Sequence, residues 1–544
     1  MQEVFCSQQL FSLLLKIKND TIGSAYLFKH DELRLRMKKR TILLLFIILV
    51  LSFFLGAKML LHGDFFYLFD QARDYMLVQD IATSHKFTLI GTHSGLGGFF
   101  HGPLWLYLLV PFYILGSGNP FTFTYAYILI ALITVFAGFI VGRKLYDTTV
   151  GLLFAFLLAI SPSIWAYVPN TIGVNMLPLV FIFLMYFIIR YLRGDAAAYI
   201  FAIFFAGLSL QFETAVSLAL LPVVIATFFL NKKAIRQIKI IILSLISLFI
   251  SLLTFILFDL RHHFLMLHAL ISLFTNTNPG KTYLPFPERI FSHSTSFQNV
   301  YESVLIQKTI FLEVLLLALF LSFIFYLYKK KIQLKKISKE FWYLLLFPLA
   351  LFIIYLGYSD PIYPEYLLGL TIPVGLAVSL ICRNFWKLAM GKIFVILFIV
   401  LNLFSSLSFL FTPYQQNLSS GSYFIQQHVA QWILHDSKGK KVGYFVYTPE
   451  TFTYGMDYLL WWESKKLHVV QPVSQKLPTT YLVLYPRLSG DAGAYTFWEK
   501  NKIKTSAPVI ESKEFPGGIT VEKLGIRSSE KPVDPTYYQN LIFR

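Results

Sequence analysis

Eleven long apolar runs constrain the fold of this chain more than any other feature. A helix that crosses a membrane needs about 20 apolar residues. The runs occupy residues 41–61, 123–141, 149–162, 176–190, 197–212, 214–230, 240–258, 309–328, 341–358, 366–382 and 393–412, of which 149–162 and 197–212 are short. The sequence therefore predicts a mainly α-helical, multispanning membrane protein with about eleven transmembrane helices in residues 41–412.

The composition agrees with this fold class. Of the 544 residues, 56% are hydrophobic and only 14% are charged, whereas soluble domains carry about 25% charged residues. The net charge of +18 would suit a nucleic acid partner. However, the Lys and Arg residues lie in short loops between apolar runs, which excludes that partner. Cys6 and Cys382 provide neither a disulfide framework nor the spacing of metal ligands.

The Lys and Arg residues also predict the orientation, because cytoplasmic loops are enriched in them. They gather in alternate loops, at Arg143, Lys144, Arg190, Arg193, 232–239, 329–339, Arg383, Lys387 and Lys392. This pattern requires the apolar segment 103–115 to rest on the outer leaflet as a juxtamembrane helix. We expect a cytoplasmic N-terminal tail (1–40), a long outer loop (62–122) and a multi-pass protein of the plasma membrane.

Residues 413–544 are more polar and contain no apolar run of spanning length. Their pattern predicts a helix near 423–435, a strand at 441–447, a helix near 453–463 and a strand at 481–485. We therefore expect a small α/β domain on the outer, extracytoplasmic face.

The outer loop 62–122 holds a cluster of ionisable residues beside the first apolar run. Asp70 and Asp74 are four residues apart, so they share one face of a helix, with Arg73 next to them. Charges beside a membrane span are costly and usually mark a site. A carboxylate there can act as a general base. The alternative is a solvated amphipathic helix with one internal ion pair.

Three motifs resemble those of membrane-embedded glycosyltransferases of the GT-C class, which includes protein O-mannosyltransferases and lipid A aminoarabinose transferases. Asp70-Gln-Ala-Arg73 is similar to the Asp-Glu-x-Arg motif of that class. The segment 100–107 (Phe-His-Gly-Pro-Leu-Trp-Leu-Tyr) is similar to its aromatic juxtamembrane segment. Gly142-Arg-Lys-Leu-Tyr146, followed by an apolar run to Ser161-Pro162, is similar to a third stretch. The resemblance covers roughly residues 41–260.

The resemblance implies that Asp70 is the catalytic base of an inverting sugar transfer. The implied donor is a polyprenyl-phosphate sugar in the lipid bilayer, and the acceptor is a protein, lipid or glycan on the outer face. The chain departs from the family pattern at Gln71, where a Glu is usual. It also lacks an acid in the loop after Ser161-Pro162, where Asn170 and Asn175 are the remaining candidates for binding the sugar.

Further substrate-binding candidates come from the chemistry of the reaction. The departing phosphate needs positive charge or hydrogen-bond donors, and Arg suits phosphate by its two-pronged geometry. The candidates for this role are Arg261, His262 and His263. Other candidates for contact with the substrate are Arg73, Asp74, His101 and Glu213. An interfacial anchor that pairs with Asp259 is the alternative for Arg261.

No cofactor is predicted with certainty. His101, His262 and His263 are residue types that bind divalent ions, so a divalent metal stays open, but their spacing in the sequence supports no metal site.

Two other function classes remain as alternatives. The chain could be a transporter or flippase for lipid-linked sugars, or a non-catalytic protein of envelope assembly. Transporters commonly show paired halves with helices broken near the midplane. This sequence shows no internal repeat, and its acids lie at one face, which favours the glycosyltransferase.

Overall fold

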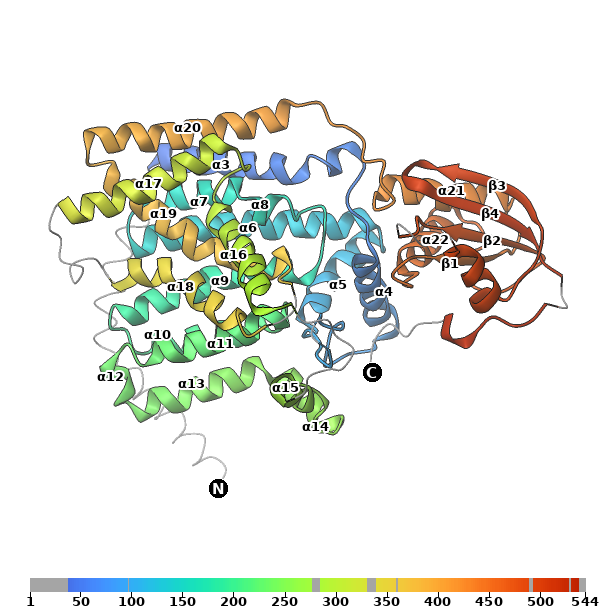
Figure 1. Ribbon diagram of the computed structural model, residues 1–544, viewed down its shortest axis with the longest axis horizontal. Helices are drawn as coiled ribbons and strands as arrows, with labels where there is room; N and C mark the ends of the chain where they lie inside the picture. Colours follow the sequence, from blue (N-terminus) through green and yellow to red (C-terminus); the bar gives the residue numbers. More distant parts are fainter. Residues whose placement is uncertain are drawn as a thin grey trace, which may run out of the picture. The chain divides into compact units, whose positions relative to one another are not determined.

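Helices dominate the computed structural model, which describes residues 38–95, 97–275, 284–329, 339–358, 361–488, 493–527 and 530–537 (Figure 1). The described residues from 49 onward form one compact unit. Most of the predicted N-terminal tail and of the loop 329–339 lies outside the described residues.

Each of the eleven apolar runs corresponds to a helix or to a bent pair of helices. These are α3 (Lys39–Ala57), α6 (Pro120–Leu145), α7 (Thr148–Ile160), α9 (Leu177–Leu192), α10 (Ala198–Ser209), α11 (Thr214–Phe228), α13 (Ile238–Ser251) with α14 (Leu253–Arg261), α17 (Ile310–Lys329), α18 (Lys339–Tyr355), α19 (Thr371–Phe385) and α20 (Ala389–Phe411).

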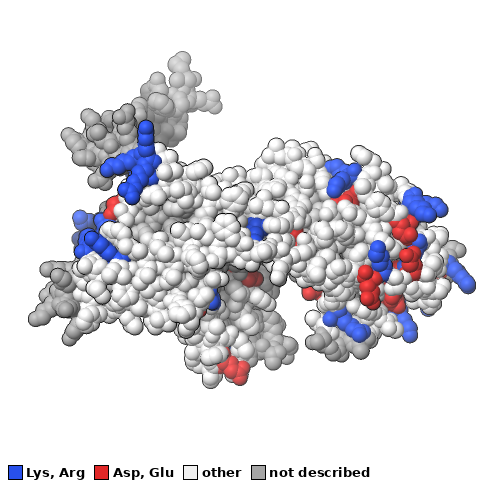
Figure 2. All heavy atoms as spheres, turned by 90° about the horizontal axis from the view of Figure 1, so that it is seen from above, with Lys and Arg blue, Asp and Glu red and all other residues white. Residues whose placement is uncertain are grey.

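Five helices of the described residues are long and apolar enough to cross a membrane, and the pair α13–α14, bent by 63°, makes a sixth. The helices α7, α10 and α11 are apolar but shorter. On the face shown in Figure 2, the surface over the helical body carries few charged side chains. The chain is therefore a membrane protein. The expected eleven crossings, and the orientation, stay predictions.

Further helices connect the apolar ones. The segment predicted as the first outer loop forms α4 (Phe69–Ser84) and α5 (Leu104–Gly116), which pack on each other. The others are α8 (Pro162–Trp165), η2 (Gly173–Met176), α12 (Lys232–Ile235), α15 (Leu265–Thr275), α16 (Phe286–Glu302) and η4 (Pro364–Leu370). The segment expected as a juxtamembrane helix, 103–115, is thus helical as α5, and its position in the membrane stays a prediction.

The C-terminal region combines helices with a four-stranded sheet, of which the sequence predicts two strands. The expected elements are α21 (Tyr423–Asp436), β1 (Gly443–Tyr447), α22 (Tyr454–Leu467) and β2 (Thr479–Leu484). The structure adds α23 (Ala494–Trp498), a π-helical turn (Glu499–Ile503), β3 (Val509–Phe515) and β4 (Ile519–Gly525). The strand order is β1-β2-β4-β3, in which β1 and β2 are parallel and the other pairs antiparallel.

Successive side chains of the strands lie on opposite faces of the sheet, as the two-residue period of a strand requires. Phe445 and Leu482 belong to an apolar cluster with Trp498 of α23 and Ile503. Their neighbours point to the helices: the Tyr444 hydroxyl donates to Asp457 of α22, and Tyr481 packs on Trp432 of α21.

Asp64 joins the first outer loop to the segment that precedes α21. Its side chain is fully buried. It accepts hydrogen bonds from the backbone N–H groups of Phe65 and Phe424, from the hydroxyls of Ser422 and Tyr414, and from the amide of Gln416. Helix α22 also packs on α4. The predicted outer loop and the C-terminal α/β region therefore meet directly, and the start of α4 lies against the C-terminal region.

Candidate functional site

Helix α4 presents a cluster of charged side chains around Arg73. The guanidinium of Arg73 lies 2.7 Å from Oδ1 of Asp70 and 3.2 Å from Oδ1 of Asp74. The Asp70 side chain is 41% exposed, whereas Asp74 is buried. The predicted sharing of one helix face is confirmed by these contacts. The cluster offers one carboxylate to solvent and keeps the other as a support for Arg73.

Gln71 fixes where α4 begins. Its side-chain oxygen accepts from the backbone N–H of Leu68, at 2.7 Å, and thereby satisfies a donor of the first turn. Its amide nitrogen donates to the carbonyls of Phe66 and Pro169. A Glu at this position could not donate to those carbonyls when ionised. The departure from the family motif thus has a structural reason, because Gln71 ties α4 to the loop after α8.

Asp74 is held by a second donor besides Arg73. The indole N–H of Trp105, on α5, donates to Oδ2 of Asp74 at 3.1 Å. Burial raises the pKa of Asp74 to about 6, and Arg73 and Trp105 oppose that rise. We infer from these contacts that Asp74 positions Arg73 and anchors α5 on α4.

The segment that follows α4 folds back and brings two histidines toward this cluster. His93 pairs with Phe100 across a short antiparallel bridge, and the N–H of His101 donates to the carbonyl of Thr92. Desolvation, with the charge of Arg73, lowers the pKa of His101 to about 3. His101 is therefore neutral near pH 7, with Nδ1 lying 3.4 Å from the hydroxyl of Thr214 on α11.

Gly102 is required at the end of this segment. A Cβ atom there would lie 1.9 Å from the side-chain oxygen of Gln211, in the turn between α10 and α11. The amide of Gln211 in turn donates to Thr254 of α14. This close approach lets the His101 segment pack directly on the start of α11.

Two further acids lie near the α4 cluster. Glu213 caps α11, where it accepts from the backbone N–H of Ala215 at 2.9 Å. Burial raises the pKa of Glu213 to about 8, and the negative charge of Glu365, on η4, adds to this rise. Glu365 is also close enough to Asp70 for their charges to interact. The structure therefore brings acids from three separate parts of the chain into one region.

Asn170 and Asn175 belong to the loop that Gln71 contacts. Asn175 is buried, and its amide donates to the carbonyls of Tyr167 and Asn170. These bonds shape the turn between α8 and η2. Asn170 is half-buried and accepts one of them through its backbone. The side-chain oxygen of Asn175 is buried and accepts no hydrogen bond from the residues that the structure describes, so both amides stay candidates for contact with a substrate.

Arg261, His262 and His263 form the corner between α14 and α15. Arg261 and His263 are exposed. His262 stacks on Phe258, whose ring lies 5.5 Å from that of Phe100. The corner therefore packs beside the His101 segment. Asp259 accepts from the backbone N–H groups at the start of α15, at Met266 and Leu267, so its carboxylate is committed to that helix.

This arrangement does not support a divalent metal site. Among the residues that the structure describes, no group of three or more His, Cys, Asp or Glu side chains could hold a metal ion. His101, His262 and His263 in particular form no such group.

Sequence reasoning did not select His93, Trp105 or Glu365 as site residues. Glu365 follows Pro361 and Pro364 in the sequence, and such prolines are typical of a rigid turn. An acid next to an apolar run was the signal that could have identified it. The neighbouring Ser359 and Asp360 lie outside the described residues.

No protein-family model matches the chain, and no curated protein sequence is significantly similar to it. The structure is similar to that of ArnT from Cupriavidus metallidurans bound to undecaprenyl phosphate. That match has a TM-score of 0.55 and 11% identity, and covers 90% of this chain and 98% of the other. The apo state of the same protein gives a TM-score of 0.58 at 11% identity, with 89% and 97% covered. The chain therefore has the fold of the GT-C glycosyltransferases, as its motifs predicted.

Proposed function

We propose that this chain is an inverting glycosyltransferase that moves a sugar from a polyprenyl phosphate to an acceptor on the outer face of the membrane. The observation that carries the proposal is the exposed carboxylate of Asp70, paired with Arg73 on α4 of a GT-C fold. ArnT, which shares this fold, binds undecaprenyl phosphate, and this supports a polyprenyl-phosphate donor here.

Asp70 is the proposed base. The hydroxyl of an acceptor is too weakly acidic to ionise by itself, and a carboxylate within hydrogen-bond distance can take its proton as the hydroxyl attacks the sugar. Such a base contributes typically 10²–10⁴-fold to the rate. Asp70 is accessible, and Arg73, itself held by buried Asp74, fixes its orientation.

The departing phosphate needs stabilisation as its negative charge develops. Arg73 and the exposed Arg261 are the cations proposed for this role, with neutral His101 as a hydrogen-bond donor. Arg73 is the better placed of the two cations for orienting Asp70, and Arg261 is freer to reach a phosphate because its side chain is exposed. Glu213 and Asn170 are proposed to contact the sugar.

The experiment compares Asp70→Asn with Asp195→Asn in liposomes that contain undecaprenyl-phosphate sugars and an envelope extract as the source of acceptor. Asp195 is a matched control, because it is also a partly exposed carboxylate paired with an arginine, Arg190. Mass spectrometry of released undecaprenyl phosphate measures transfer. We expect release to fall at least about 100-fold in Asp70→Asn and to stay near the wild-type rate in the control.

Full release by Asp70→Asn would refute the proposed base. Movement of the intact donor across the bilayer by wild-type protein, without any release, would instead identify a transporter.

A further inference from the structure

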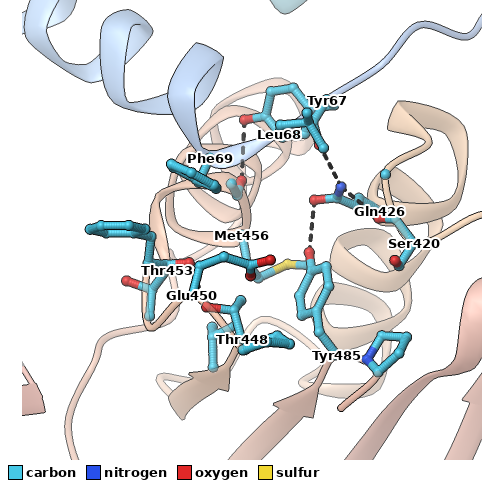
Figure 3. A pocket seen from close by; sticks show the side chains of 16 residues that line it. Tyr67, Leu68, Phe69, Ser420, Gln426, Thr448, Glu450, Thr453, Met456 and Tyr485 are labelled. Atoms are coloured by element: carbon cyan, nitrogen blue, oxygen red, sulfur yellow. Dashed lines mark hydrogen bonds between the residues drawn. The ribbon is translucent and has the colours of Figure 1, made fainter. Parts of the chain in front are cut away.

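A cavity of about 250 Å³ lies where the start of α4 meets the C-terminal region. Its lining comes from four parts of the chain: Tyr67, Leu68 and Phe69, the segment 420–426, the segment 446–456 from β1 to α22, and Tyr485 with Pro486 (Figure 3). Pockets for drug-sized ligands are typically about 300–1,000 Å³. This cavity therefore suits a single small ring.

The floor of the cavity is rigid because its polar groups are bonded to one another. The amide of Gln426 donates to the carbonyls of Tyr67 and Ser420, and its oxygen accepts from the Tyr485 hydroxyl at 2.7 Å. The Tyr67 hydroxyl donates to the carbonyl of Gly455. Figure 3 shows this chain of bonds behind the open space. A ligand would meet a preformed surface.

Aromatic rings form one wall. Phe69 and Phe452 stack with their centroids 4.8 Å apart, and Phe452 stacks on Tyr454 at 5.7 Å. Both Phe69 and Phe452 are only half-buried. The exposed parts of these stacked rings provide apolar area with little conformational freedom to lose on binding. They suit the apolar C–H groups of a sugar ring.

The charge of the lining indicates which ligands the cavity can bind. Glu450 is the one charged residue among those that line the cavity, and its side chain extends into the open space in Figure 3. Thr448 presents a hydroxyl beside it, while donating to the carbonyl of Phe452. A carboxylate without a lining cation repels phosphates and other anions, and accepts hydrogen bonds from hydroxyl or ammonium groups.

The cavity adjoins the proposed site. Phe69 lines it and directly precedes Asp70 in α4. Tyr454, between two lining residues, is close enough to Arg73 for the charge of the guanidinium to act on the pKa of its hydroxyl. A molecule held at the aromatic wall could extend along the start of α4 toward Asp70.

We propose that this cavity binds one neutral or amino sugar ring of a glycan acceptor and so presents that acceptor to Asp70. The role as an acceptor site rests on the proposed glycosyltransferase function. The binding of a sugar by the cavity does not.

The test uses the full chain in lipid nanodiscs and saturation-transfer NMR with three probes: methyl α-glucoside, glucosamine and glycerol phosphate. We expect saturation of both sugars and none of glycerol phosphate. Phe452→Ala should reduce the saturation of both sugars at least fivefold. Glu450→Lys, at an exposed position, should reduce that of glucosamine more than tenfold and that of the neutral glucoside at most threefold.

Two controls separate this inference from the proposed function. Phe497→Ala removes an exposed aromatic ring of α23 that does not line the cavity, and it should leave saturation unchanged, as should Asp70→Asn. Absence of sugar saturation in the wild type would overturn the proposal that the cavity binds a sugar. Unchanged saturation in both Phe452→Ala and Glu450→Lys would overturn it as well. Movement of the intact donor across the bilayer by the wild type, without release of undecaprenyl phosphate and with sugar saturation intact, would overturn the proposed function and leave the sugar-binding cavity standing.

Discussion

Two parts of the segment 62–122, the predicted outer loop, use carboxylates in opposite ways. Asp64, in the turn before α4, is fully buried and surrounded by donors from its own turn and from the segment 414–424. Asp70, six residues later on α4, is 41% exposed and paired with Arg73. A carboxylate whose lone pairs are all occupied has none to offer a substrate. The comparison therefore indicates that Asp64 stabilises the fold, whereas Asp70 is available to contact a substrate.

The largest expected effect on stability is that of Asp64→Asn. The new NH₂ group would face donors such as the Phe424 N–H and the Ser422 hydroxyl, and would leave buried groups unsatisfied. Each such group costs about 1–3 kcal/mol, so we expect the free energy of unfolding to fall by at least about 3 kcal/mol. Cys382 is a buried free cysteine. Thermal unfolding can therefore be followed with a thiol-reactive dye in a Cys6→Ser background.

Ser422→Ala provides a graded control, because it removes one donor to Asp64 and keeps the carboxylate. Its loss should be smaller than that of Asp64→Asn. Equal stability of Asp64→Asn and the parent protein would show that this buried cluster does not hold the C-terminal region to the outer loop.

The sequence predicts local features of this molecule well. The apolar runs identify the long helices, and the spacing of Asp70 and Asp74 identifies one face of α4, because both signals lie within one element. The β3–β4 pair was not predicted. Strand β3 is exposed along most of its length and shows no apolar alternation. The Gly517–Gly518 turn, with φ of 77° and 75°, and the alternation in β4 were usable signals.

The role of Asp64 could not be predicted, because its partners follow it by about 350 residues in the chain. The same reason applies to Glu365, which approaches Asp70 and Glu213 only in the folded chain. Candidate site residues within one segment are readable from their spacing. Their grouping across α4, α11 and η4 depends on tertiary packing that a single sequence does not reveal.

A second prediction tests how α4 supports Asp70. Trp105→Phe removes the donor to buried Asp74, and hydrogen bonds to charged groups contribute about 1.5–3 kcal/mol. The donor opposes the rise in the pKa of Asp74, so the bond contributes more when Asp74 is ionised. We expect the unfolding free energy of Trp105→Phe to be lower by about 2 kcal/mol at pH 8. This difference should shrink below about pH 6, as measured with the same thiol-reactive dye.

Trp165→Phe is the matched control, because the indole N–H of Trp165 donates to a neutral acceptor, the carbonyl of Ile160, at 2.9 Å. The loss of unfolding free energy in Trp165→Phe should not vary with pH. If the loss in Trp105→Phe were equally independent of pH, the role given to the Asp74 contact would be contradicted.

A third prediction concerns Glu213, whose pKa burial raises to about 8. The unfolded chain has the lower pKa, about 4.3, so between these values the folded state binds more protons. Stability therefore falls as the pH rises through this window, by at most about 1.4 kcal/mol per pH unit. Glu213→Gln keeps the acceptor for the Ala215 N–H and should remove this slope.

Asp457→Asn serves as the comparison, because burial raises the pKa of Asp457 only to about 6. Asp457→Asn should reduce the pH dependence of the unfolding free energy below about pH 6. The fall in unfolding free energy between pH 6 and 8 should remain. A slope between pH 6 and 8 that persists in Glu213→Gln would show that Glu213 is not the titrating group.

The smallest expected effect on stability is that of Asp70→Asn. The pair with Arg73 is partly exposed, and such pairs contribute about 0.2–1 kcal/mol. The change also removes the repulsion between Asp70 and Glu365, which offsets part of that loss. We therefore expect the unfolding free energy to change by less than about 1 kcal/mol, although transfer is lost. If Asp70→Asn destabilised the protein as much as Asp64→Asn, the contrast between a structural and a chemical carboxylate would fail, and loss of transfer would only report unfolding.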